Sequence, residues 1–276
     1  MSLSSRAPFF ITIFISTSHS PMKFMRIFTS FAAILCCIMG NISISAQELP
    51  SPDTVVLLHG LGRTSKSMAY MEERLTEAGY HVFNYDYESR KGEIDSLVAD
   101  LQQYLEICCS LKESDLHFVT HSLGGILVRG LIARVRPENL GRVVMLSPPN
   151  KGSETVDLLK DYRIFEKFFG PASMQLGTDP ESFPNSLGPA DFELGIITGD
   201  RTIDPISSWI IPGVDDGKVA VEKTKLEGMT DFLLVNVSHA YIIKKPEVVL
   251  EVLHFLKNGR FSTSEALVPE GARVLP

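Results

Sequence analysis

The sequence predicts an α/β fold, in which a mostly parallel sheet carries helices on both faces. The first observation is that apolar segments rich in β-branched residues alternate after Asp53 with longer segments whose apolar residues recur every three or four positions. The second is that the apolar segments are unbroken, as in Thr54–Leu58, which is typical of strands buried on both faces. The third is the length of 276 residues with 44% hydrophobic content, which suffices for one large core.

Six strands and five helices follow from this alternation. The strands are expected at 54–59, 81–87, 116–120, 142–146, 192–198 and 231–237. The helices are expected at 65–78, 93–109, 123–135, 217–225 and 246–256. In the second helix the apolar residues from Ile94 to Cys108 fall at spacings of three and four, which gives one stripe to pack on a sheet.

Residues 148–191 interrupt the alternation as a long insertion after a strand. Within it the apolar residues share one predicted helical face: Leu158, Leu159, Tyr162, Phe165, Phe168 and Phe169. Two interpretations stay open, a helix packed on the core and a cap over the carboxyl edge of the sheet, where insertions in such folds cover a binding site. Both interpretations can be true at once, because a cap helix can also pack on the core.

A serine lies at the junction of a predicted strand and a predicted helix. Strand 116–120 runs into Thr120–Gly124, with Ser122 at the centre, and the helical pattern begins at once. Such a turn presents the hydroxyl at the carboxyl edge of the sheet, where the helix N-terminus offers backbone N–H groups to an anion. The residues two before and two after the serine must be small. Gly124 meets this condition, whereas the β-branch of Thr120 predicts strain.

Further polar residues follow the ends of other predicted strands. His59–Gly62 follows the first strand, and its glycines allow close approach of the loop to a ligand. Asp215 and Asp216 precede a helical pattern, and His239 follows the last strand. The chain order is therefore Ser, Asp, His, with each residue beyond the carboxyl end of a strand.

That order and those positions resemble α/β-hydrolases of the lipase and esterase type, over nearly all of the chain after the N-terminal segment. The resemblance implies an α/β-hydrolase fold with a short cap insertion and a catalytic triad of Ser122, Asp216 and His239. It also implies an oxyanion hole formed by the backbone amides of Leu61 and Leu123. His59 and His121 are expected to line the edge of the site without acting as bases.

The acid is the ambiguous member of the triad. Asp216, directly before Gly217, matches the Asp-Gly of related lipases, and Asp215 is the alternative, because one of the pair could instead cap the helix at 217–225. Asp200 and Asp204 are the remaining candidates. A calcium site built from Asp200, Asp204 and Asp215 is an alternative use, although the spacing matches no recognised calcium loop. The expectation is no metal and no cofactor.

The resemblance implies a serine hydrolase that cleaves carboxylic esters of lipids or other acyl groups through an acyl-enzyme. In that case the aromatic face of the insertion, Phe165 and Phe168 in particular, would line the acyl site. Three alternatives share the chemistry, a thioesterase, an acyltransferase or an amidase, because the triad does not select the leaving group. A catalytically silent relative that binds lipid or a partner protein is the alternative of a different class. A dehalogenase is disfavoured because its nucleophile would be an aspartate at position 122.

Residues 1–46 predict a secretory signal. Lys23 and Arg26 precede an apolar stretch from Ile27 to Met39, and small residues lead to Ala46. The apolar part is shorter than the roughly 20 residues that a membrane span needs. Translation is expected to start at Met22 or Met25. The mature domain is then 47–276, secreted or periplasmic, with an uncleaved membrane anchor as the alternative.

Charge and cysteine content limit the partners. Three of the 26 basic residues and none of the 33 acidic ones fall within 1–46, so the rest of the chain carries about −10. This balance argues against nucleic acid and leaves a small-molecule or lipid ester, with peripheral membrane contact as a further option. Cys108 and Cys109 are expected to be buried apolar residues that do not bridge, because adjacent side chains on a helix diverge.

Overall fold

A computed structural model describes residues 52–109, 114–203 and 211–262, all within the unit Pro50–Pro276. The predicted signal segment, its start sites Met22 and Met25, and Asp204 lie outside the described residues. No helix among the described residues is long and apolar enough to span a membrane.

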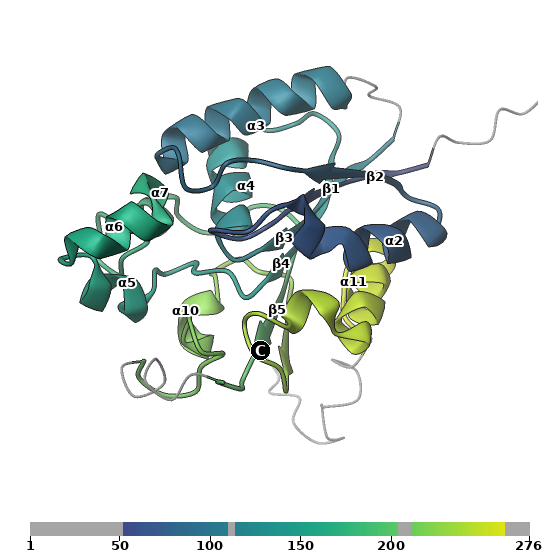
Figure 1. Cartoon of the computed structure of the whole chain (residues 1–276). Helices are drawn as coiled ribbons and strands as arrows, with labels where there is room; N and C mark the ends of the chain where they lie inside the picture. The colour runs from purple at the N-terminus through teal and green to yellow at the C-terminus, as the bar shows by residue number, and fades with distance from the viewer. Residues whose placement is uncertain (1–51, 110–113, 204–210, 263–276) are drawn as a thin grey trace, which may run out of the picture. The chain divides into compact units, whose positions relative to one another are not determined.

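A single parallel sheet of six strands forms the centre, in the order β2-β1-β3-β4-β5-β6 (Figure 1). The strands are β1 (Thr54–Leu58), β2 (His81–Tyr85), β3 (Leu116–His121), β4 (Leu140–Leu146), β5 (Leu194–Gly199) and β6 (Asp231–Val235). Each predicted strand is present, with ends shifted by up to two residues. From β1 the chain first moves outward to β2 and then crosses back to β3, so the direction of winding reverses between β1 and β3. Ligands bind at the carboxyl side of such a switch point.

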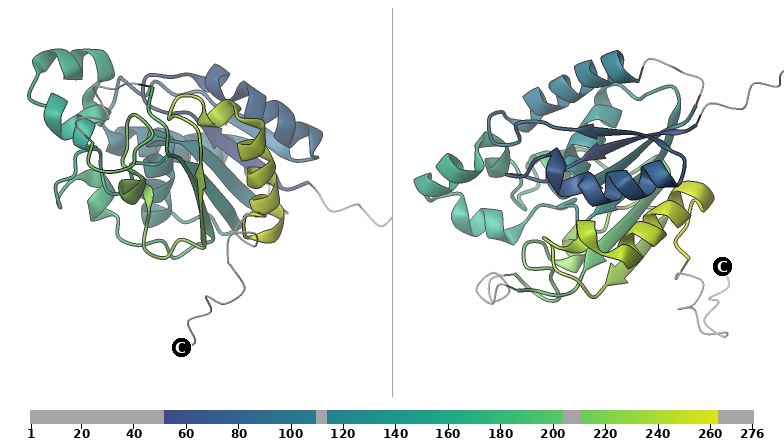
Figure 2. Two further views of the ribbon diagram at one scale, coloured as in Figure 1. Left: turned by 90° about the horizontal axis from the view of Figure 1, so that it is seen from below. Right: turned by 45° about the vertical axis from the view of Figure 1, so that its right-hand side comes forward.

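Helices cover both faces, as predicted (Figure 2). α3 (Ile94–Cys108) and α4 (Leu123–Arg134) pack on one face, while α2 (Ala69–Glu77), preceded by η1 (Ser65–Met68), and α11 (Pro246–Asn258), preceded by η2 (Ile242–Lys244), pack on the other. Alternate residues of one strand serve the two cores: Val56 and Leu58 belong to the first, Val55 and Leu57 to the second. All four are fully buried, which explains the unbroken apolar pattern of β1.

The insertion after β4 consists of short helices and not of one amphipathic helix. They are α5 (Glu154–Leu159), α6 (Arg163–Phe169), α7 (Pro171–Met174) and α8 (Phe183–Ser186). The predicted common helical face is wrong, because the chain breaks between α5 and α6. Within α6, Phe165 is buried in the core, whereas Phe168 and Phe169 are exposed. Leu158 and Tyr162 are exposed as well. Figure 1 shows α5, α6 and α7 grouped at one end of the sheet.

A buried arginine ties this insertion to α4. Arg129 donates to the backbone oxygen and to the side-chain oxygen of Asn150, at 3.0 and 3.2 Å, and to the backbone oxygen of Gly188 at 2.8 Å. These acceptors lie near the two ends of the 148–191 insertion. No carboxylate lies within ion-pair distance of Arg129 among the described residues, and burial lowers the pKa of its guanidinium to about 10. The guanidinium donors of Arg129 therefore hold backbone carbonyls of the insertion in place and do not bind a carboxylate.

The two cysteines depart from the prediction. α3 ends at Cys108, and Cys109 has already left helical geometry, so the two side chains do not diverge. Their sulfurs lie 2.6 Å apart, and both residues are half-buried and free thiols. The assumption that failed is that both residues belong to the helix.

Replacing Arg129 by Met should lower the free energy of unfolding by about 2–3 kcal/mol, because two buried backbone carbonyls lose a charged donor. Urea unfolding followed by circular dichroism measures the change. Arg134→Met is the matched control on the same helix, where the exposed arginine pairs with Asp95; it should cost less than about 1 kcal/mol. Equal losses in both variants would contradict the anchoring role of Arg129.

Candidate functional site

Ser122 occupies a strained turn at the carboxyl end of β3. Its φ is 52° and its ψ −119°, a left-handed region that a residue with a Cβ enters at a cost of about 1–3 kcal/mol. The strain is offset by the surroundings: the Ser122 amide donates to the Leu146 carbonyl at the end of β4, and α4 begins at the next residue. Ser122 is partly exposed between the fully buried Thr120 and Leu123.

Two glycines make room for this turn. A Cβ at Gly124 would lie 2.8 Å from the Leu58 carbonyl oxygen, so α4 starts directly against the end of β1. A Cβ at Gly125 would lie 3.2 Å from Thr120 Oγ1. Thr120 therefore stays in regular strand pairing, opposite Leu58 and Met145, and the expected strain falls on Ser122. The cost at Thr120 is a buried hydroxyl with no hydrogen-bond partner among the described residues.

The loop after β1 lies next to Ser122. A Cβ at Gly60 would be 3.2 Å from Ser122 Cβ, which leaves glycine as the residue that fits. His59 is fully buried, stacks on Tyr87 at 4.1 Å between ring centroids and donates from Nδ1 to the Gly60 carbonyl. Tyr87 in turn donates its hydroxyl to the His59 carbonyl at 2.6 Å. The side chains of His59 and Tyr87 thus hold the loop conformation through hydrogen bonds to its backbone carbonyls.

The amides of Leu61 and Leu123 flank the serine. The Leu61 amide makes no hydrogen bond within the described part of the chain, and the Leu123 amide, as the first of α4, has no partner inside its helix. Unpaired backbone donors on both sides of a serine form a geometry that can accept an oxyanion.

Asp216 and His239 are brought together. His239 Nδ1 donates to Asp216 Oδ2 at 2.8 Å, and the His239 amide donates to the Asp216 carbonyl at 2.8 Å. The other carboxylate oxygen, Oδ1, accepts the amides of Lys218 and Val219 at 3.0 and 2.9 Å. Asp216 therefore combines two functions that the sequence presented as alternatives, partner of the histidine and cap of the following turn. With Nδ1 donating to Asp216, Nε2 is the nitrogen left to accept a proton.

The Asp216 carboxylate remains charged although it is buried. Burial alone would raise its pKa, but the charge and hydrogen bond of His239, the Ser147 hydroxyl and the Val219 amide outweigh burial and lower the pKa below its usual range. Ser147 follows β4, is fully buried and has φ 50°, so a second strained serine lies at this edge. Its hydroxyl faces Asp216 and makes no well-formed hydrogen bond in the described part of the molecule.

His121 links the serine turn to the histidine loop. Its Nε2 donates to the His239 carbonyl at 3.0 Å, and the two rings lie 4.8 Å apart. Burial, followed by the nearby His239, lowers the pKa of His121 well below its usual value, so the ring is neutral. His121 therefore supports the His239 backbone through Nε2, whereas its Nδ1 is buried beside Gly60 and has no hydrogen-bond partner among the described residues.

The other candidate acids lie elsewhere. Asp215 accepts the Gly217 amide at 2.7 Å, and Asp200 accepts from the Asn236 side chain at 3.0 Å. The helix predicted at 217–225 is only α10 (Val221–Thr224), because the turn closed by Asp216 precedes it. No hydrogen bond joins Ser122 to His239 among the described residues, so the structure pairs His239 with Asp216 and leaves the serine contact open.

Phe165 and Phe168 have different environments. Phe165 is 8% exposed and belongs to the core, and its ring lies beside that of the exposed Phe169, with ring centroids 4.9 Å apart. Phe168 is 60% exposed and lines a cleft of about 430 Å³ together with Arg63, which follows the loop beside Ser122. Only Phe168 of the two is placed where a ligand can reach it.

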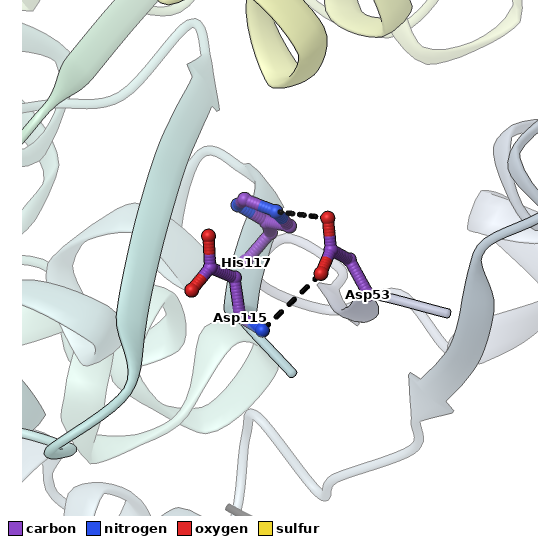
Figure 3. Close-up of side chains that lie close together, drawn as sticks. All are labelled: Asp53, Asp115 and His117. Carbon is purple, nitrogen blue, oxygen red and sulfur yellow. Dashed lines mark hydrogen bonds and ion pairs between the residues drawn. The ribbon is translucent and has the colours of Figure 1, made fainter. Parts of the chain in front are cut away.

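A second polar cluster lies at the opposite end of the sheet, where β1 and β3 begin (Figure 3). Ligand atoms of Asp53, Asp115 and His117 lie within 4.8 Å of one another. However, His117 Nδ1 accepts the Arg142 amide at 2.7 Å, which places the ring proton on Nε2, the atom that faces Asp53 at 3.6 Å. A protonated nitrogen is not a metal ligand. We therefore interpret this cluster as a structural connection between the first residues of β1, β3 and β4.

Comparison with known proteins agrees with this architecture. A model of the palmitoyl protein thioesterase family matches residues 54–179, which is less than half of the chain. A lipase from Bacillus licheniformis in its mature form superposes with a TM-score of 0.57 at 19% identity, covering 77% of this chain and 94% of that one. The chain has the α/β-hydrolase fold. The predicted fold class is confirmed.

Two further structures with this fold are similar. A phospholipase from Legionella pneumophila gives a TM-score of 0.59 at 18% identity, covering 79% of this chain and 62% of that one. A metagenomic carboxyl esterase gives 0.53 at 14% identity, covering 77% and 79%. No curated protein matches the chain by sequence. At these identities the likeness establishes the fold, and the activity is argued from the site.

Three residues of the site region were not found from the sequence. Ser147, Tyr87 and Arg129 act through buried contacts with residues far away in the chain, and none belongs to a local motif. Ser147 does carry a signal, since it directly follows a predicted strand and therefore reaches the same edge as Ser122. Ser122, Asp216 and His239 occupy the same edge, each beyond the end of a strand.

Mild acidification should destabilise the folded chain. Burial lowers the pKa of His59, His117 and His121 below the ordinary 6.5, so their contribution is complete above pH 6.5 and is lost as the pH falls below it. For each of these histidines, the free energy of unfolding should drop by up to about 1.4 kcal/mol for each unit by which the pH falls. Urea unfolding at pH 7.5, 6.5 and 5.5 measures the slope. His121→Asn, which removes one titrating ring, should reduce that slope; an unchanged slope would contradict the neutral state of His121.

Proposed function

We propose that the chain is a serine hydrolase that cleaves carboxylic esters of lipids or other acyl groups, with Ser122, Asp216 and His239 as its catalytic triad. The observation that carries the proposal is the hydrogen bond from His239 Nδ1 to the buried, charged Asp216, which fixes the tautomer with Nε2 free to accept a proton. The strained, partly exposed Ser122 at the elbow supports it. Strain at a catalytic nucleophile is a recurrent feature of this turn.

In the proposed reaction His239 Nε2 removes the proton from Ser122 Oγ as the oxygen attacks the acyl carbon. The carbonyl oxygen becomes an oxyanion, which the amides of Leu61 and Leu123 accept; one such donor is typically worth roughly 3 kcal/mol of the barrier. Collapse releases the alcohol, which takes the proton from His239. A water molecule, deprotonated by the same nitrogen, then hydrolyses the acyl-enzyme and releases the carboxylic acid.

His239 reaches Ser122 by a small adjustment of side chains in this proposal. The serine contact is the hydrogen bond of the triad that the described geometry leaves open, and catalytic hydrogen bonds are often loose before a substrate is bound. His121 limits the adjustment to the side chain, since it holds the His239 backbone carbonyl at 3.0 Å.

A thioesterase is the second candidate. The match of residues 54–179 to the palmitoyl protein thioesterase family favours it, and that match contains Ser122 and the loop after β1. The mechanism is unchanged apart from the leaving group, a thiol in place of an alcohol. We also propose that residues 1–46 direct export from the cytoplasm, as their pattern predicts.

Ser122→Ala tests the proposal. The variant should lose hydrolysis of p-nitrophenyl butyrate by at least about 10³-fold, since no other described side chain can take the place of the nucleophile, and should keep its melting temperature. A fluorophosphonate probe should label the wild-type protein and not the variant. Wild-type turnover in the variant, or absence of labelling in the wild-type protein, would exclude the serine mechanism.

Asp216→Asn should separate the two adjacent aspartates. The amide keeps one oxygen for the Lys218 and Val219 amides but permits the wrong histidine tautomer, so turnover should fall by about 10⁴-fold, as for a serine protease. Asp215→Asn is the matched control, because Asp215 accepts the Gly217 amide and an Asn side chain can accept the same amide. Its activity and melting temperature should change little. Loss of activity in Asp215→Asn alone would move the acid to that residue.

Phe168→Ser tests the acyl contact. If Phe168 packs against the acyl chain, kcat/KM for a p-nitrophenyl ester of a long acid should fall by about tenfold or more, given roughly 0.8 kcal/mol per buried methylene, while the acetate ester has little to lose. Leu250→Ser, an equally exposed apolar residue on α11, is the control. Phe165 is unsuited to this test, because it is part of the core. Equal losses on both esters would remove Phe168 from the acyl site.

A further inference from the structure

We propose that the cleft between the loop after β1 and α6 binds a phosphate group carried by the substrate. This inference rests on the proposed function and names its substrate class, an acyl ester or thioester that carries a phosphate. The cleft has a volume of about 430 Å³, within the usual range for small-molecule sites. We define it by Arg63, Arg90, Lys167 and Phe168 on its walls, with the buried Tyr87 and Ser89 at its base.

The charge of this cleft contrasts with that of the chain. Four basic and two acidic side chains line it, a net charge of +2, whereas the whole chain carries −7. One of the four, Lys91, pairs with Glu88 at 2.6 Å. Asp86 is the second acid, and it accepts the Ser65 amide at 2.7 Å. Neither acid lies within ion-pair distance of Arg63, Arg90 or Lys167.

The three remaining cations have no carboxylate partner among the described residues. Arg90 directs one guanidinium nitrogen to the Phe168 carbonyl at 3.5 Å and leaves its other donors free, and no contact of Arg63 or Lys167 with an acid is found in the described ranges. In an acidic chain, three cations that share one cleft without counter-charges attract an anion. Guanidinium and ammonium groups together suit a phosphate, whose oxygens accept several donors at once.

The walls of the cleft are hydrogen-bonded to the loop that lies next to the candidate active site. Arg63 donates its amide to the Gly60 carbonyl at 3.2 Å, and Gly60 lies against Ser122. Ser89 accepts the Gly62 amide at 2.9 Å, so the base of the cleft is hydrogen-bonded to the same loop. A phosphate held by Arg63 would therefore lie next to an acyl carbon at Ser122. Phe168 adds an apolar wall, as an amphiphilic substrate requires.

The test compares two butyrate esters that differ in charge, p-nitrophenyl butyrate and the butyrate ester of 4-hydroxyphenyl phosphate. In the double variant Arg63→Gln/Lys167→Gln, the ratio of kcat/KM for the phosphate ester to that for the neutral ester should fall at least tenfold. Glu88→Gln/Lys91→Gln is the matched control in the same cleft, because it removes an existing ion pair and leaves the net charge of the cleft at +2; the ratio should stay within twofold. An unchanged ratio in the double variant, or an equal fall in the control, would overturn the proposal.

A second pair of substrates distinguishes a lipid head group from a soluble phosphate. Dihexanoylphosphatidic acid and dihexanoylglycerol, both below their aggregation concentrations, share acyl groups and differ in the phosphate. If the cleft serves phospholipids, the double variant should lose activity selectively on the former. If it serves soluble esters, the selectivity should appear only with the phenyl phosphate ester.

A binding measurement keeps this inference separate from the proposed function. Ser122→Ala should bind phenyl phosphate by calorimetry in 50 mM salt, more weakly at 500 mM salt, and at least tenfold more weakly when Arg63→Gln and Lys167→Gln are added. If the wild-type protein hydrolysed neither ester but this binding were observed, the proposed function would fail and the phosphate site would stand. Absence of binding in Ser122→Ala, beside normal ester hydrolysis in the wild-type protein, would reject the site alone.

Discussion

The arrangement of the candidate site depends on the Asp216 carboxylate, whose two oxygens serve two loops. Oδ1 closes the turn that follows β5 by accepting two backbone amides, and Oδ2 holds the ring of His239 from the loop after β6. The backbone contact from the His239 amide to the Asp216 carbonyl adds a second connection between the same loops. Burial alone would disfavour the charged carboxylate, and the groups that Asp216 positions stabilise that charge. The carboxylate therefore becomes stably ionised only when the two loops have folded around it.

Much of the fold could be predicted because a parallel sheet imposes a simple pattern. A strand buried on both faces must be apolar throughout, so Thr54–Leu58 could be recognised from its own residues, and the order of the elements then places Ser122, Asp216 and His239 at one edge. The insertion could not be predicted in this way. Its position is fixed by contacts of Asn150 and Phe168 with Arg129 and Arg90, which are distant in the sequence, and Phe165 and Phe168 cannot be told apart by periodicity.

The choice between Asp215 and Asp216 shows the same limit at a smaller scale. Both residues are buried and both accept backbone amides, so local capping rules apply equally to each. What distinguishes them is which side chain meets the loop after β6: Asp216 accepts from His239, and its Cβ packs against Gly199. Similarly, the elbow accommodates Thr120 because Gly125 lies beside its hydroxyl, a contact that the sequence pattern does not predict.

The hydrogen bond from His121 to the His239 carbonyl has a consequence for how variants of this protein are interpreted. His121 precedes the serine, so one neutral ring sets the position of the elbow and of the base loop together. Under the proposed mechanism, position 121 would therefore rank with the reacting residues in a mutational screen scored by turnover, although it exchanges no proton. The two histidines, with ring centroids 4.8 Å apart, would then be a reacting ring and a supporting ring, and the supporting ring is the one next to Ser122 in the sequence.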